Sequence, residues 1–128
     1  MTPKFRAYDS GSLSRMYQPD EVMVGNGDIW IIDEDSVAGD WIVNNDIHLM
    51  QSTGLKDKNG KEIFEGDIVD YKGREAVVKW HGSYASFIYR FVDGLKERVS
   101  EWDPLFLACY NFEVIGNIYE NPELLEVE

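Results

Sequence analysis

The side chains best suited to nucleophilic or metal chemistry in this chain are one cysteine, Cys109, and two histidines, His48 and His81. Neither histidine lies near Cys109 in the sequence. A nucleophilic cysteine requires a base or positive surroundings that lower the pKa of its thiol, and a metal site requires ligands at characteristic short spacings. We therefore expect an unreactive buried thiol and structural or solvent-facing histidines, with no catalytic, cofactor or metal site.

The acidic residues of segment 33–40 are the next candidates, because clustered carboxylates bind calcium. Counted from Asp33, the positions at which an EF-hand loop needs glycine and glutamate hold Ala38 and Asn44. The pattern therefore predicts no such loop. General acid catalysis requires a carboxyl group whose pKa is raised by burial or by a neighbouring charge. A small carboxylate-dependent hydrolase stays open as an alternative, which a concave pocket with two buried carboxylates would favour.

The charge of the chain restricts its partners. It carries 24 acidic and 12 basic residues, a formal net charge of −12, and the segment 16–55 holds eight acids and no Lys or Arg. Because proteins bind DNA and RNA largely through Lys and Arg on the phosphates, we expect no direct nucleic-acid binding. The opposite role stays open as an alternative: an acidic decoy that imitates DNA and blocks a host nucleic-acid-binding protein.

The expected location is the cytoplasm of a bacterial host cell. Residues 1–4 lack the apolar core of an export signal. The longest apolar runs, such as 105–110, are too short to cross a bilayer, so we expect no membrane partner. A single cysteine also excludes an internal disulfide.

The elements that would position these side chains are mostly short strands. Within residues 1–52, β-branched and aromatic runs occur at 4–8, 15–17, 29–32, 41–43 and 47–50. Turn-forming Gly, Asn and Asp residues separate them, and the strongest turn signal lies at 25–28. This alternation predicts a mainly β protein that begins with a small N-terminal antiparallel sheet region.

Residues 53–128 predict a second, barrel-like subdomain with a tail. We expect strands at 68–71, 76–80, 86–91, 107–110 and 112–118, with hairpin turns at Lys72-Gly73 and Asp93-Gly94. So many short strands in so few residues favour a small closed β-barrel, since closure removes exposed edges. A short C-terminal helical turn then begins at Asn121-Pro122, where Asn caps the turn and Pro occupies its first position.

The boundary between the two parts is a glycine-punctuated stretch, residues 53–69, whose polar residues are suited to tight turns. Glycine permits backbone conformations closed to other residues, and Asp or Asn side chains accept hydrogen bonds from nearby backbone N–H groups. The structural turn signature consists of Gly54, Asp57, Asn59, Gly60, Gly66 and Asp67.

Three blocks, 4–9, 50–69 and 114–125, resemble the YopX family of phage and prophage proteins. They span nearly the whole chain, and the central block is long. The resemblance implies an SH3-like barrel for the second part, residence in a phage or an integrated prophage, and self-assembly into a multimer. It implies no catalytic residue.

The aromatic content favours a role in binding. Phe87, Tyr89 and Phe91 alternate along one strand and share one face, with Ile88 on the other. We expect the aromatic residues chiefly in the core and in strand pairs. The alternative is an exposed patch at a subunit or partner interface, where aromatic residues concentrate, with this face as the first candidate and Ile88 packing inward. The favoured function is a non-enzymatic phage accessory protein that self-associates into a homo-oligomer and binds a host or phage protein.

Overall fold

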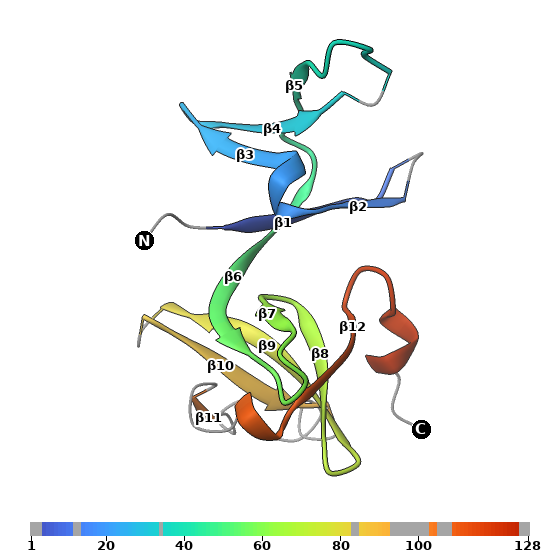
Figure 1. Ribbon diagram of the computed structural model, residues 1–128. Helices are drawn as coiled ribbons and strands as arrows, with labels where there is room; N and C mark the ends of the chain where they lie inside the picture. Colours follow the sequence, from blue (N-terminus) through green and yellow to red (C-terminus); the bar gives the residue numbers. More distant parts are fainter. Residues whose placement is uncertain are drawn as a thin grey trace. The chain divides into compact units, whose positions relative to one another are not determined.

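The computed structural model describes residues 4–11, 14–33, 35–82, 85–92, 103–104 and 109–125. The protein is mainly β, which confirms the predicted fold class, and it divides into two compact units, Met1–Gln51 and Ser52–Glu128. Figure 1 labels the strands along the chain. Their bounds, in chain order, are β1 (Phe5–Asp9), β2 (Arg15–Tyr17), the 3-10 turn η1 (Pro19–Glu21), β3 (Val22–Gly25), β4 (Asp28–Ile32), β5 (Trp41–Val43), β6 (His48–Lys56), β7 (Glu62–Phe64), β8 (Asp67–Tyr71), β9 (Arg74–His81), β10 (Ser86–Phe91), β11 (Asp103–Pro104), η4 (Cys109–Asn111), β12 (Glu113–Asn117) and η5 (Pro122–Leu125).

In the first unit, β1 pairs antiparallel with β2 and with the first residues of β6, and β4 pairs between β3 and β5. The predicted turn at 25–28 is confirmed, because Asn26 and Gly27 both adopt positive φ, 53° and 80°. Two positive values in succession give the tight hairpin that matches the twist of its strands. The core of this unit is a cluster of buried side chains, Ala7, Tyr17, Val22, Ile31 and Ile47.

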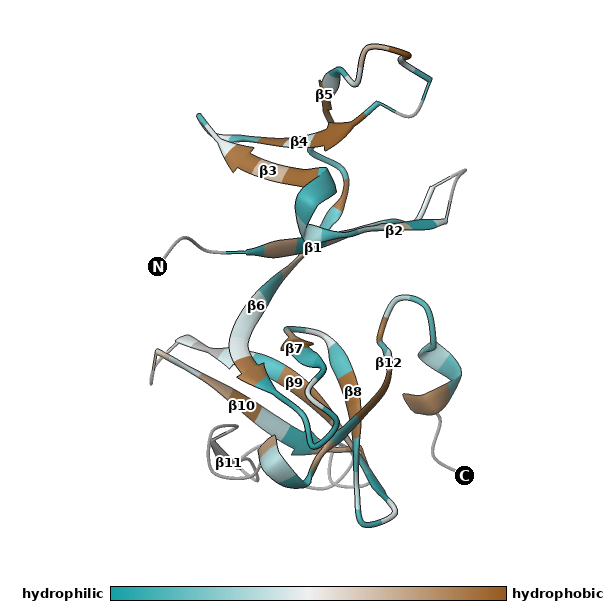
Figure 2. Cartoon of the chain, viewed as in Figure 1, coloured by the Kyte–Doolittle hydropathy of each residue, from teal (hydrophilic) through white to brown (hydrophobic). Residues whose placement is uncertain are grey.

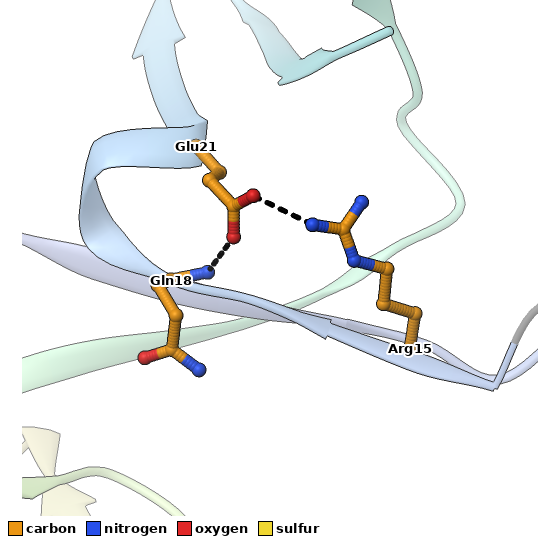
Figure 3. Close-up of polar contacts among 3 residues, drawn as sticks. All are labelled: Arg15, Gln18 and Glu21. Atoms are coloured by element: carbon orange, nitrogen blue, oxygen red, sulfur yellow. Dashed lines mark hydrogen bonds and ion pairs between the residues drawn. The ribbon is translucent and has the colours of Figure 1, made fainter. Parts of the chain in front are cut away.

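A polar contact joins β2 to η1 (Figure 3). One carboxylate oxygen of Glu21 accepts a hydrogen bond from the Arg15 guanidinium at 2.6 Å, and the other accepts the backbone N–H of Gln18 at 3.0 Å. The same carboxylate thus satisfies an N–H at the start of the 3-10 turn and fixes that turn against the preceding strand.

In the second unit, five antiparallel strands lie in the order β11-β10-β9-β8-β12, and β7 pairs with the end of β6. The predicted turn between β8 and β9 is confirmed by positive φ at Lys72 (52°) and Gly73 (89°). The principal core contains Ile63, Val69, Ala76, Val78, Tyr89, Cys109 and Phe112. The SH3-like closure of this sheet stays a prediction.

The C-terminal turn is present as η5, and its sequence explains why it stays on the sheet. Leu124 and Leu125 pack, together with Ile118, against a second cluster of buried residues formed by Ile68, Val77 and Val92. The Leu124 N–H of η5 donates to the backbone carbonyl of Asn121 at 3.1 Å, whereas the Asn121 carboxamide oxygen accepts the N–H of Asn117 at 3.2 Å.

Two expectations about the strands need correction or lie outside the described residues. The strand expected at 107–110 is wrong at its described end, where Cys109 and Tyr110 belong to the 3-10 turn η4. Residues 107 and 108 and the Asp93-Gly94 turn lie outside the described part of the chain.

The alternative of an exposed Phe87, Tyr89 and Phe91 face is wrong, and the expected core packing is confirmed for these three residues. Tyr89 is buried in the principal core, and Phe87 and Phe91 are half-buried against that core. The Tyr89 ring meets the Phe112 ring edge-on at 4.8 Å between centroids. Ile88, on the opposite face, is buried as well, so β10 is covered on both sides.

Candidate functional site

The turn signature is organised around the buried carboxylate of Asp57. Its Oδ1 accepts the backbone N–H groups of Asn59 and Lys61, each at 2.9 Å, and its Oδ2 accepts the N–H of Val114 at 2.9 Å. Two of these donors belong to the turn itself, and the third belongs to β12. One side chain therefore closes the turn and attaches it to a strand from the far end of the chain.

The electrostatics of Asp57 favour the ionised carboxylate. Burial by itself raises the pKa of this carboxyl, but the N–H groups of Val114, Lys61 and Asn59 and the charge of Lys61 lower it by more. The pKa of Asp57 therefore lies below its ordinary value of 3.8. A general acid requires the opposite shift, so this carboxylate acts as an anchor for backbone N–H groups.

The other buried carboxylate that the structure describes, Asp67, is also bound to backbone. Its Oδ2 accepts the N–H of Phe64 at 2.8 Å across the turn that contains Gly66. Gly54, Gly60 and Gly66 adopt positive φ of 77°, 82° and 87°, conformations that other L-residues rarely adopt. Asp57, Gly60, Gly66 and Asp67 therefore build turns, whereas Gly54 lies within β6, where the register with β7 shifts between Ser52 and Lys56.

Asn59 differs from the expectation that it bonds within its own turn. Its carboxamide Nδ2 donates to the Glu113 carboxylate of β12 at 3.3 Å. The turn is therefore held to β12 by Asn59 as well as by Asp57. Sequence spacing gave no signal for this contact, because Asn59 and Glu113 lie on elements brought together only by the fold.

The closing block of the chain forms a second set of backbone anchors. The Asn117 Oδ1 accepts the N–H groups of Tyr119 at 3.0 Å and Glu120 at 2.9 Å. Asn121 folds back over Gly116, where an added Cβ would lie 2.5 Å from the Asn121 Oδ1. Gly116 is therefore required by the close approach of a side chain.

The residues suited to chemistry are dispersed. Cys109 is buried in the core of the second unit. In the first unit, the Nε2 of His48 lies 3.1 Å from the Ser10 hydroxyl at an exposed position, a pair that sequence reasoning missed because only the β1–β6 register aligns it. Among the described residues, no three His, Cys, Asp or Glu side chains gather as metal ligands.

The feature best suited to binding is an apolar sheet surface that sequence reasoning did not single out. On the three-stranded sheet, Met23, Trp30 and Val43 stand side by side in register, and Trp41 lies two residues from Val43 on the same face. Met23, Trp41 and Val43 are 48%, 37% and 45% exposed. We call these four residues the apolar face, and Figure 2 shows the hydrophobic character of the three strands.

The opposite face of this three-stranded sheet is apolar as well. Val22 and Ile31, which pair in register, are buried in the core of the first unit. A sheet that covers a core with one side normally turns polar residues outward on the other. Here both sides are apolar, and the Val22–Ile31 side is packed only in part, because Val24 and Ile42 on that side are each 44% exposed. The sequence pattern alone therefore does not show which of these apolar residues are covered.

Comparison with known proteins assigns the chain to a protein family. A model of the YopX protein family matches residues 4–126. The chain belongs to the YopX family. A crystal structure of protein EF1440 from Enterococcus faecalis is similar to this YopX protein, with 30% sequence identity, a TM-score of 0.60, and coverage of 98% of this chain and 99% of that one.

Two further findings are negative. No curated protein matches this YopX protein. Within the described residues, none of its helical segments has the length and apolar character needed to cross a membrane.

Proposed function

We propose that this YopX protein is a non-enzymatic, self-associating binding module, encoded by a phage or prophage and active in the cytoplasm of the bacterial host. The observation that carries the proposal is the apolar face of β3, β4 and β5. A large contiguous patch of exposed apolar residues on a folded protein marks an interaction surface. Trp and Met, both present on this face, are enriched at protein interfaces.

Self-association removes this surface from water. Burying apolar area stabilises a complex by about 25 cal/mol for each Å², and a symmetric dimer covers the same patch on both copies. The two buried carboxylates that the structure describes in the second unit, Asp57 and Asp67, accept backbone N–H groups, and this supports a structural role for them in place of a catalytic one.

The test is the molar mass in solution, measured by light scattering on a sizing column. The wild-type chain is expected to elute at a multiple of 14.8 kDa at micromolar concentration. Met23→Lys places a charge on the apolar face and is expected to shift the mass toward the monomer. Val37→Lys adds the same charge at a fully exposed loop position and serves as the matched control.

Two results would count against self-association through this face. The first is a monomeric wild-type protein. The second is a multimer that Met23→Lys and Val37→Lys leave equally intact.

A further inference from the structure

Strand β5 is an unpaired edge with three exposed side chains. It lies at one end of the three-stranded sheet, and Trp41, Ile42 and Val43 are 37%, 44% and 45% exposed. Among the residues that the structure describes, no strand pairs with its outer side. Edge strands present main-chain N–H and C=O groups that can pair with another chain.

The register shows which main-chain groups face outward. The Asn44 N–H donates to the Ile29 carbonyl at 2.8 Å, and the Asp33 N–H donates to the Asp40 carbonyl at 2.8 Å. Hydrogen-bonded pairs alternate along an antiparallel ladder, so Ile42 directs its N–H and C=O toward β4. Those of Trp41 and Val43 therefore point away from β4, where they can receive a further strand.

Acidic side chains stand at both ends of this edge. Asp35 and Asp40 precede β5 and are exposed, and Asp46 follows it and is exposed. Hydrogen bonds order part of this group, because the Asp40 Oδ2 accepts the Ser36 hydroxyl at 2.8 Å. The whole segment 16–55 contains no Lys or Arg to neutralise these charges.

We propose that the outer edge of β5 binds an extended segment of another protein, with apolar residues at its centre and Lys or Arg at both ends. The segment adds a fourth strand: its main chain pairs with Trp41 and Val43, its apolar side chains lie beside theirs, and its basic ends meet the aspartates. This site shares Trp41 and Val43 with the apolar face, but it binds through their outward main-chain N–H and C=O groups at the edge of the sheet, which contacts across the apolar face do not use.

The charges favour this occupant over a second copy of the chain. Antiparallel pairing of β5 with itself would place the acidic start of one strand beside the acidic end of the other. Like charges across an interface disfavour the complex. A segment with basic ends reverses the sign of that interaction and strengthens binding at low salt.

The experiment measures binding of a fluorescein-labelled peptide, Lys-Lys-Val-Ile-Val-Lys-Lys, to the full chain by fluorescence anisotropy. Saturable binding that weakens as NaCl is raised is expected. Two control peptides separate the contributions: one carries Glu in place of every Lys, and the other is N-methylated at both valines, which keeps the charge and removes the donors that face β5. Neither control is expected to bind measurably.

Variants of the protein test the edge itself. Val43→Pro removes an outward N–H that β4 does not use and is expected to abolish binding, while Val24→Pro removes an outward N–H at the opposite edge of the same sheet and is expected to retain it. Replacing Asp35 and Asp46 together by Asn is expected to weaken binding about fivefold. Circular dichroism verifies that each variant is folded.

Three outcomes would overturn the proposal: equal binding of the N-methylated peptide, unchanged binding by folded Val43→Pro, or no binding of the Lys-flanked peptide. Light scattering on the same samples keeps this test separate from self-association. A monomer that binds the peptide would refute the apolar-face proposal alone, and a multimer that ignores the peptide would refute the edge proposal alone.

Discussion

Replacing Asp57 by Asn is expected to destabilise the second unit. The size of the loss in unfolding free energy follows from the hydrogen bonds that the Asp57 carboxylate accepts. The wild-type carboxylate accepts two N–H groups on Oδ1 and one on Oδ2, whereas Asn has one oxygen. The better orientation keeps that oxygen on Asn59 and Lys61 and turns the NH2 group toward the Val114 N–H. One charge-assisted bond is lost and two donors face each other, at a cost of about 2–3 kcal/mol.

The pH dependence of this loss is specific to Asp57. Its folded pKa lies below the ordinary value of 3.8, so its stabilisation is complete above that value and disappears as the pH falls through the lower, folded pKa. The Asn variant has no such titration. The difference in unfolding free energy between wild type and variant is therefore expected to be full at neutral pH and to narrow on acidification.

Urea denaturation, followed by circular dichroism and tryptophan fluorescence over a series of pH values, measures this difference. Glu123→Gln, an exposed carboxylate in the same unit, is the control and is expected to change stability by less than about 0.5 kcal/mol. Equal stability of the Asn variant and wild type at neutral pH would refute the anchoring role. If the difference in unfolding free energy between wild type and the Asn variant stays constant as the pH falls, the ionised Asp57 carboxylate is not the source of the stabilisation.

Three further substitutions test the packing, each by urea denaturation. Gly116→Ala places a Cβ 2.5 Å from the Asn121 Oδ1 and is expected to cost about 1–3 kcal/mol; adding Asn121→Ala should recover part of that loss, and no recovery would show that the clash lies elsewhere. Phe112→Ala removes a fully buried ring and is expected to cost about 3–5 kcal/mol, so a loss below about 1 kcal/mol would contradict its place in the core. Gly73→Ala is expected to cost about 1 kcal/mol because φ is 89° there, whereas Gly82→Ala, which meets nothing within 4 Å, should be close to neutral; similar costs for the two would contradict the turn assignment.

The local parts of this structure were accessible to sequence reasoning. The turns at Asn26-Gly27 and Lys72-Gly73 follow from the φ values that these residues tolerate, which depend on no distant contact. The strands between them follow from alternation with a period of two residues. The C-terminal turn was accessible for the same reason, because Pro122 fixes its own backbone angle.

The parts that sequence reasoning missed depend on partners far along the chain. Alternation divided β10 into a Tyr89 face and an Ile88 face, but Phe112, which covers Tyr89, comes from another element. Trp41 and Val43 have the composition of core strands, and only the exposure of their side chains in the folded chain shows that they are not covered. Composition identifies apolar residues without identifying what covers them.

A ribosome releases Asp57 well before it releases Val114, whose N–H the carboxylate accepts at 2.9 Å in the finished fold. During that interval the charged group lacks one of its partners and keeps its best solvation by remaining in contact with water. The bond between the Asp57 carboxylate and β12, and the pairing of Val114 with Val69 in β8, therefore form only after residue 114 has emerged.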